Sequence, residues 1–230
     1  MKTIGLIGGM SWESSVEYYR IMNEEVKNRL GGLHSVKCLL YSVDFAEIER
    51  YQMEGDWDSA GKVLGEVALS LEKAGAEFIV ICTNTMHKVI DFIEAKIKIP
   101  VLHIADATAN QIKKSNLTTV GLLGTKYTME QDFYKSRIEL NGIRVLVPHA
   151  PEQEMINKVI YEELCLGKIK QSSRDCYKEV IKNLVVNGAE GIILGCTEIG
   201  LLVKQEDSEV PLFDTTEIHA IESVNKALEN

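Results

Sequence analysis

The chain lacks any apolar run long enough to cross a membrane. A membrane-spanning helix needs about 20 consecutive apolar residues, and no run in this sequence approaches that length. The N-terminus carries one lysine before an apolar stretch that Gly5, Gly8 and Gly9 interrupt, so neither a signal peptide nor a lipidation motif is evident. We therefore expect a cytoplasmic protein with no membrane partner.

Paired cysteines and positive charge are also scarce. The cysteines are five, an odd number without CxxC spacing: Cys38, Cys82, Cys165, Cys176 and Cys196. This pattern favours reduced thiols over a disulfide scaffold or a zinc site. The net charge is −9 and the pI is about 5.2. Nucleic acid would be repelled at long range, so we expect a small-molecule partner.

The sequence contains an internal repeat. Residues 4–11 resemble 120–127, residues 75–85 resemble 188–198, and residues 99–103 resemble 210–214. The second copy follows the first by 111 to 116 residues, so the register is nearly constant. A duplicated half of this length predicts two similar domains, and the 230 residues suffice for two small domains.

Short apolar runs alternate with longer segments of helical period, which is typical of parallel strands joined by helices. The predicted strands are 3–8, 37–42, 77–82, 100–104, 118–123, 143–147, 190–195 and 210–213. The predicted helix stripes are Leu64, Val67 and Leu71, and Cys176, Val180, Ile181, Leu184 and Val185. The sequence thus predicts an α/β protein of two pseudo-symmetric domains, each a parallel sheet flanked by helices.

Polar or glycine-rich loops follow four of these strands. They are Gly8–Ser11, Thr83–Thr85, Thr125–Thr128 and Cys196–Glu198. Ligands of parallel sheets bind beyond the carboxyl ends of the strands, so we expect the active site in a cleft between the two domains. The first loop is not GxGxxG and has no clear acidic ribose partner, which disfavours a nucleotide. Its glycines serve either a tight turn or the close approach of a carboxylate.

Cys196 and Thr83 occupy matching positions of the repeat. A free cysteine is commonly a small buried hydrophobic residue. At a helix N-terminus, however, the pKa of a thiol falls below its usual value of about 8.5, and the thiol becomes a usable base. Two groups on opposite walls of a cleft suit a reaction in which a proton leaves one face of a carbon and returns on the other.

These motifs resemble the aspartate/glutamate racemase family, which is independent of pyridoxal phosphate. The resemblance rests on Gly8-Gly9-Met10, on Asn84-Thr85-x-His87 and on Gly195-Cys196-Thr197-Glu198, and it covers nearly the whole chain. It implies two α/β domains with the active site between them, often in a homodimer. It also implies that the last strand and helix return to the first domain, which gives domains of 1–99 with 210–230 and of 100–209. Nothing in the sequence calls for a metal or an organic cofactor.

The sequence departs from the family pattern at Thr83, where a cysteine is usual. Cys82 lies one residue too early, so strand alternation should turn its side chain into the core. An alcohol ionises roughly 7 pKa units above a thiol, a gap on the order of 10 kcal/mol. The two faces should therefore work unequally. The resemblance implies that the cysteine of the second copy serves the L-form, so we expect Cys196 to remove the α-proton from the L-form, and Thr83, alone or with water, to return a proton on the opposite face.

The remaining predicted site residues bind substrate. They are Met10, Gln52, Asn84, Thr85, Tyr127, Thr128 and Thr197, of which Asn84, Thr85 and Thr197 could equally be helix caps. In the aspartate branch the resemblance implies two basic residues; Arg50 could fill the first position, but Cys165 stands at the second. His87 and Glu198 could support the site or simply lie near it.

Two other functions fit the same residues. A decarboxylase resembling the arylmalonate type needs only one cysteine, as proton donor, although hydroxyl-rich loops favour a polar diacid substrate over the apolar pocket that decarboxylation requires. A non-catalytic amino-acid-binding protein would bind without exchanging the α-proton. The predicted function remains a racemase of aspartate, glutamate or both, with the L-form preferred.

Overall fold

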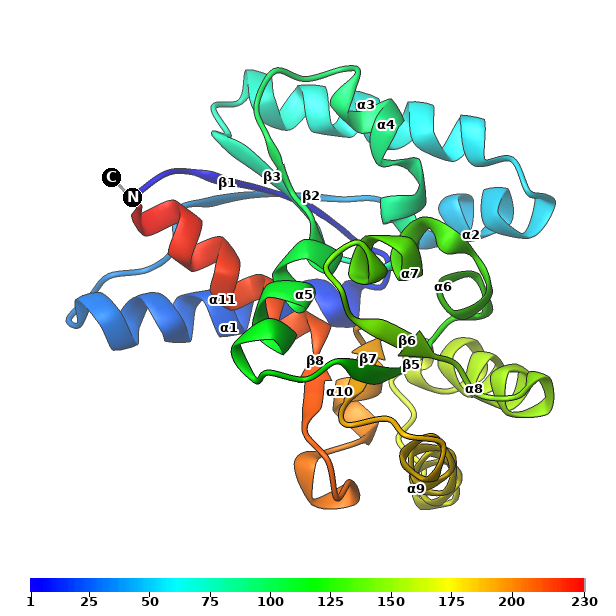
Figure 1. Ribbon diagram of the computed structural model, residues 1–230. Helices are drawn as coiled ribbons and strands as arrows, with labels where there is room; N and C mark the ends of the chain where they lie inside the picture. The colour runs from blue at the N-terminus through cyan, green and yellow to red at the C-terminus, as the bar shows by residue number, and fades with distance from the viewer. Residues whose placement is uncertain (230) are drawn as a thin grey trace. The chain divides into compact units, whose positions relative to one another are not determined.

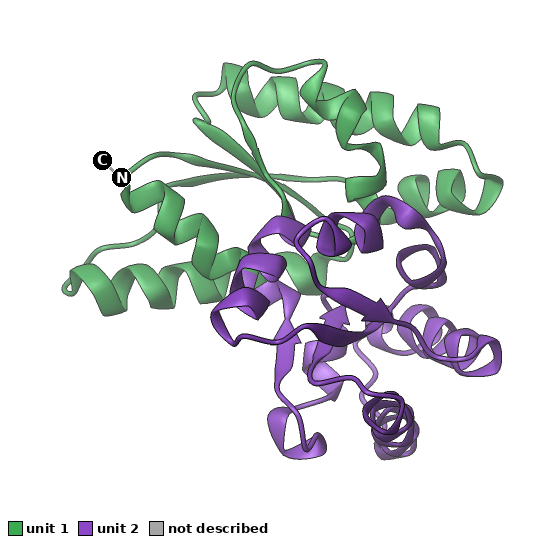
Figure 2. Ribbon diagram, viewed as in Figure 1, with its two compact units in different colours: residues 1–103, 219–230 green, residues 104–218 purple. Residues whose placement is uncertain are grey.

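The computed structural model describes residues 1–229 and divides the chain into two compact units. The first consists of Met1–His103 with the C-terminal segment from His219, and the second of Ile104–Ile218 (Figure 2). Each unit contains one four-stranded parallel sheet, in the order β2-β1-β3-β4 and β6-β5-β7-β8 respectively. The two orders are identical when the strands are numbered within each copy, so the sequence repeat is a repeat of topology.

All eight predicted strands are present. Those of the first sheet are β1 (Ile4–Gly8), β2 (Cys38–Ser42), β3 (Phe78–Ile81) and β4 (Val101–Leu102). Those of the second are β5 (Thr119–Gly124), β6 (Arg144–Leu146), β7 (Ile192–Gly195) and β8 (Leu212–Asp214). In both sheets the central strands are the most buried, as expected of a parallel sheet covered on both faces.

Helices cover both faces of the first sheet (Figure 1). The helices of this unit are α1 (Trp12–Leu30), α2 (Phe45–Glu54), α3 (Trp57–Lys73), the 3₁₀ helix η1 (Thr85–Val89) and α4 (Ile90–Glu94). One core lies between the sheet and α2, α3 and α4, and it includes Leu64, Val67 and Leu71 of the predicted stripe. The other lies between the sheet and α1 and α11 (Thr215–Leu228).

The second sheet is covered in the same way. Its helices are α5 (Ile104–Lys114), α6 (Lys126–Glu130), α7 (Asp132–Glu139), α8 (Ala150–Glu162), η2 (Leu164–Leu166), α9 (Gln171–Val186), α10 (Ile199–Leu202) and η3 (Gln205–Asp207). One core includes side chains of α8, α9 and α10, and the other those of α5 and α7. In α9, Val180, Ile181 and Leu184 are buried as predicted, whereas Cys176 is exposed and Tyr177 is buried in its place.

Two glycines show how closely the copies match. A Cβ on Gly5 would lie 2.8 Å from Ile79 Cδ1, and one on Gly121 would lie 2.7 Å from Ile192 Cδ1. Each glycine pairs in register with that isoleucine of the neighbouring strand. A side chain at either glycine would displace the helix packed above the central strands, so both copies need glycine there for the same steric reason.

The domain boundaries differ from the predicted ones by four and nine residues. The divisions fall after His103 and after Ile218 rather than after residues 99 and 209. β8 pairs with β7 in the second sheet and does not return to the first; only the following helix, α11, contributes to the first core, through Ala220, Val224 and Ala227. The reason is the repeat itself, because β8 completes the second sheet as β4 completes the first.

Candidate active site

The loop after β1 is built around a tight turn. Gly9 has φ +90°, and a side chain there would clash with the Val43 carbonyl oxygen. Its backbone N–H donates to Ser15 Oγ at 2.8 Å. Met10, a predicted substrate contact, is only 2% exposed and packs in the core with Ile48. The glycine of this loop therefore serves the turn, and its amide already has a partner inside the protein.

The loop after β3 carries Thr83. Cys82 is fully buried in the core with Phe78 and Val80, which confirms that its side chain turns away from the loop. Burial raises the pKa of the Cys82 thiol far above its ordinary range. The backbone N–H of Thr83 donates to the Ile81 carbonyl at 2.9 Å. Thr83 thus lies two residues after the end of β3 and directly follows the buried Cys82.

Three predicted substrate-binding residues lie on segments that contact each other in the first unit. Asn84 precedes η1, Thr85 is its first residue, and both are buried. Gln52, on α2, is also buried, and its Nε2 donates to Met86 Sδ of η1 at 2.9 Å. Arg50, by contrast, is exposed and lies over the Tyr51 ring.

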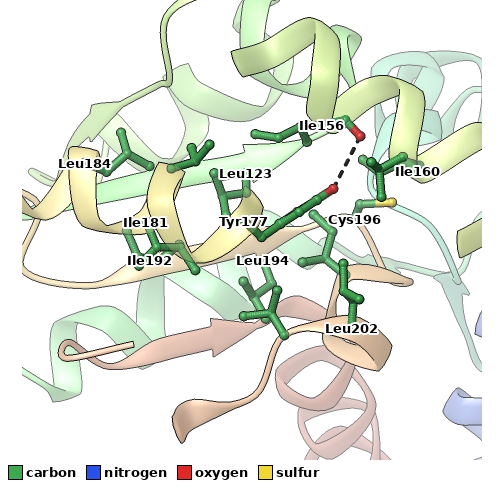
Figure 3. Close-up of a cluster of buried hydrophobic side chains, with 14 of the residues drawn as sticks. Leu123, Ile156, Ile160, Tyr177, Ile181, Leu184, Ile192, Leu194, Cys196 and Leu202 are labelled. Atoms are coloured by element: carbon green, nitrogen blue, oxygen red, sulfur yellow. Dashed lines mark hydrogen bonds between the residues drawn. The ribbon is translucent and has the colours of Figure 1, made fainter. Parts of the chain in front are cut away.

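The loop after β7 brings together Cys196, Thr197 and Glu198, all buried. Cys196 Sγ donates to Glu198 Oε2 at 3.0 Å, and Thr197 Oγ1 donates to the same oxygen at 2.8 Å. The Glu198 carboxylate therefore contacts the thiol directly. Figure 3 shows Cys196 beside Tyr177 and Ile160 in the core of this unit.

The predicted lowering of the thiol pKa is wrong. Burial raises the pKa of Cys196 well above its ordinary value, and the negative charge of Glu198 raises it further. The helix that follows, α10, has only four residues, so its dipole is too small to offset either effect. The resting thiol therefore keeps its proton and shares it with a carboxylate acceptor.

The loop after β5 lies beside the Cys196 loop, because Gly124 pairs with Gly195 at the ends of neighbouring strands. Thr125 caps α6 by accepting from the Thr128 backbone N–H at 3.3 Å, and the two threonine hydroxyls lie 3.1 Å apart. Thr128 is fully buried, whereas Tyr127 is partly exposed. Thr125 is thus the N-cap of α6.

The first unit contains a buried cluster of imidazoles that was not predicted from the sequence. The ring centroid of His87 lies 4.4 Å from that of His103 and 6.0 Å from that of His219. All three rings are at most 4% exposed. The repeat does mark one of these residues as unusual, because it places His103 opposite the acidic Asp214. Within residues 1–229 no group of three or more His, Cys, Asp or Glu side chains has a geometry that could hold a metal ion.

None of the helices found between residues 1 and 229 is both long and apolar enough to span a membrane.

Comparison with known proteins points to one family. The sequence pattern of the Asp/Glu/Hydantoin racemases matches residues 7–222. A crystal structure from Yersinia pestis, assigned as an Asp/Glu racemase, is 58% identical over the full length of both chains, with a TM-score of 0.92. That of an aspartate racemase homologue from Pyrococcus horikoshii OT3 is 38% identical over the full length of both, with a TM-score of 0.86.

A curated relative agrees with the solved structures. The broad specificity amino-acid racemase RacX of Bacillus subtilis (strain 168) is 27% identical over 183 residues, which are 75% of this chain and 74% of RacX. Racemases are isomerases, and the two-sheet fold matches that of the related structures. The chain therefore belongs to the Asp/Glu/Hydantoin racemase family of isomerases.

Proposed function

We propose that this protein is a cofactor-independent racemase of aspartate, glutamate or both, that it prefers the L-form, and that Cys196 and Thr83 serve opposite faces of the α-carbon. Relatives named as aspartate and glutamate racemases and as a broad-specificity racemase support this substrate class. The proposed preference for the L-form rests on two points: the two groups are unequal, a thiol with a carboxylate partner and an alcohol, and the family resemblance implies that the cysteine of the second copy serves the L-form.

The observation that carries the proposal is the hydrogen bond from Cys196 Sγ to Glu198 Oε2, 3.0 Å long. A buried thiol with a raised pKa cannot act as a base in its resting state. A carboxylate within hydrogen-bond reach supplies the missing base, because it can accept the thiol proton when a substrate binds. The positive α-ammonium group of an amino acid would favour that transfer by stabilising the thiolate.

The reaction then proceeds in three proton transfers. The Cys196 proton moves to Glu198, and the thiolate takes the α-proton of the L-amino acid, leaving a carbanion. The Thr83 hydroxyl, or a water beside it, delivers a proton to the opposite face and gives the D-form. Glu198 then releases its proton to solvent and the Thr83 side regains one from solvent, which restores the resting site. Hydrogen bonds from Asn84, Thr85 and Thr197 to the α-carboxylate would stabilise the carbanion, since its charge spreads into that group.

Proton NMR in heavy water tests the proposal. Loss of the α-proton signal should be followed for L- and D-aspartate and for L- and D-glutamate, with wild type, Cys196→Ala and Cys176→Ala. Cys176 is an exposed thiol on α9 and serves as the matched control. We expect exchange from at least one L-form, abolished by Cys196→Ala and retained by Cys176→Ala. If all four substrates keep their α-proton, amino-acid racemisation is the wrong function.

A single-cysteine decarboxylase is the second candidate, and one observation favours it. The resting Cys196 thiol holds its proton, which is the state that a carbanion formed by loss of carbon dioxide would need. An arylmalonate assayed for carbon dioxide release separates this function from racemisation. Calorimetric binding of aspartate without α-proton exchange would instead indicate an amino-acid-binding protein. The homodimer remains a prediction for light scattering to test.

A further inference from the structure

Three of the five histidines of the chain form the buried cluster of the first unit, and the proposed reaction uses none of them. They come from segments far apart in the sequence: His87 from η1, His103 from the end of β4 and His219 from α11. Burial of an imidazole is costly unless its nitrogens are hydrogen-bonded. The hydrogen bonds of these rings therefore indicate what the cluster holds in place.

The partners of His219 fix its tautomer. Its Nε2 lies 2.9 Å from the Leu102 carbonyl oxygen, which can only accept, so Nε2 carries the proton. Nδ1 must then accept from the Tyr18 hydroxyl, 2.8 Å away. His219 thus links α1, β4 and α11, and it remains neutral because burial lowers its pKa to about 4.

His87 has the other tautomer. Its Nδ1 lies 2.9 Å from the carbonyl oxygen of Thr83, so Nδ1 carries the proton and donates to that oxygen. The backbone N–H of His87 donates to the Asn84 carbonyl at 3.1 Å. The ring of His103, packed against that of His87, limits the directions in which His87 can turn. A buried imidazole, packed against a second ring, therefore holds the main chain of the residue proposed to serve the second face.

The peptide groups around Thr83 are held from both sides. Ser14 Oγ, on α1, donates to the Cys82 carbonyl at 3.0 Å, and His87 donates to the next carbonyl, that of Thr83. Since β3 ends at Ile81, these carbonyls have no place in the strand ladder. Side-chain donors consequently set the orientation of both peptide planes, and hence the direction in which the Thr83 side chain leaves the backbone.

The second copy of the repeat has no counterpart of this arrangement. The repeat places Gly200 opposite His87 and Asp214 opposite His103. A Cβ on Gly200 would clash with the Asp214 carboxylate, so no ring fits there. Asp214 instead accepts from the backbone N–H groups of Thr216 and Glu217. The pair of His87 and His103 therefore belongs to the copy that carries Thr83. The copy that carries Cys196 has Glu198 instead.

We propose that His87 is a positioning residue for Thr83: its Nδ1–H, directed by packing against His103, fixes the Thr83 carbonyl and thereby aims the hydroxyl at the α-carbon. This inference rests on the proposed racemase function. His87 acts on the return of the proton at the Thr83 face and not on its removal by Cys196. Its loss should therefore separate two rates that a general loss of structure would lower together.

The two rates can be measured in one solution. Exchange of the α-proton of L-aspartate or L-glutamate in heavy water reports removal by Cys196, and appearance of the D-form reports delivery from the Thr83 face. Substrate binding affects both rates, so the ratio of exchange to racemisation isolates the delivery of the proton from the Thr83 face. His87→Gln moves the amide to the Nε2 position and removes the Nδ1 donor. His87→Asn keeps a donor nitrogen near Nδ1, and His34→Gln changes an exposed histidine as the control.

We expect His87→Gln to raise the ratio of exchange to racemisation by roughly 10- to 100-fold, the size of effect that a misplacement of about 1 Å produces. His87→Asn should return the ratio toward that of wild type, and His34→Gln should not change it. Equal losses of both rates in His87→Gln, an unchanged ratio, or a His87→Asn variant as impaired as His87→Gln would overturn the proposal.

A measurement on the wild-type protein tests the proposal even if a His87 variant does not fold. Nitrogen-15 NMR of the imidazoles should show the Nδ1–H tautomer for His87 and the Nε2–H tautomer for His219. An Nε2–H tautomer at His87 would overturn the proposal without any substitution. Absence of exchange in wild type with the Nδ1–H tautomer present would contradict the racemase function and leave the His87 contact intact, so the two failures are distinguishable.

Discussion

The thiol of Cys196 donates to the carboxylate of Glu198 at 3.0 Å, and Thr197 donates to the same oxygen. This contact gives Glu198 opposite effects on the two states of the site. In the resting state its charge raises the pKa of the thiol. In the proposed reaction it accepts the thiol proton. On this proposal Glu198 suppresses the thiolate at rest and allows it to form when substrate binds.

Replacing Glu198 by glutamine should nearly abolish α-proton exchange. The amide can still hydrogen-bond to the thiol but cannot take its proton, and loss of such a proton acceptor typically lowers rates by about 10²- to 10⁴-fold. Exchange of L-aspartate and L-glutamate in heavy water measures the effect. Glu206→Gln, which changes an exposed carboxylate of the same unit, is the control. A variant with wild-type exchange would show that Glu198 is not the proton acceptor.

The same substitution should make Cys196 more reactive toward iodoacetamide. In wild type, exposed Cys176 should be alkylated well before Cys196, because Cys196 is buried and its pKa is raised. Glu198→Gln removes one cause of the raised pKa, so alkylation of Cys196 should begin at lower pH. Mass spectrometry of peptides alkylated at several pH values follows both cysteines. Equal pH dependence in wild type and variant would mean that burial alone sets the pKa.

Much of the fold could be predicted because the repeat and the apolar runs are strong local signals. Each predicted strand overlaps an observed one, and the turn of Cys82 into the core follows from strand alternation. The placement of β8 was wrong because strand pairing is non-local and was inferred from a resemblance. The repeat indicated the correct pairing, because Val210-Pro211-Leu212 matches Ile99-Pro100-Val101 and so aligns β8 with β4.

The site was harder to predict, for electrostatic reasons. The position of Cys196 after a strand suggested a helix N-terminus and a lowered pKa, but the sign of the shift depends on burial and on where the Glu198 carboxylate points. Neither can be read from spacing along the chain. The cluster of His87, His103 and His219 joins three distant segments, and no local pattern connects them.

Thr83→Cys should raise activity on the D-form. A thiol in place of the hydroxyl gives the second face an acid and base that is easier to ionise by roughly 7 pKa units, judged against the value for water. Exchange of the α-proton of D-aspartate and D-glutamate measures the change. The matched control is Cys82→Ala, since the Cys82 thiol is buried in the core and should not reach substrate. No gain on either D-form would count against a role for position 83 on that face.

Tyr18→Phe should destabilise the protein by about 1 to 3 kcal/mol, the usual cost of leaving a buried polar group without its partner. The substitution removes the donor to His219 Nδ1, and this nitrogen is fully buried with its ring. Tyr19→Phe changes the next residue of α1, which is half exposed, and should have little effect. Urea unfolding followed by circular dichroism compares the variants. Equal stability of both would mean that the hydroxyl contributes nothing to holding His219.

Stability should fall as the pH decreases from about 6.5 to 4. Burial lowers the pKa of His219 to about 4, whereas an unfolded histidine titrates near 6.5. Between these values the unfolded chain binds a proton that the folded protein does not, so acid favours unfolding. The charged form of His219 would also face the ring of His87, whose own pKa is lowered by burial and by its imidazole neighbours.

The size of the acid effect follows from the shift of about 2.5 pKa units, which corresponds to roughly 3 kcal/mol for His219 alone. Urea unfolding at intervals between pH 7.5 and 4 measures it, and His219→Gln should flatten the profile over this window. His34→Gln, an exposed control, should leave the profile as in wild type. A wild-type stability that is constant from pH 6.5 to 4 would show that the pKa of His219 is not lowered in the folded protein.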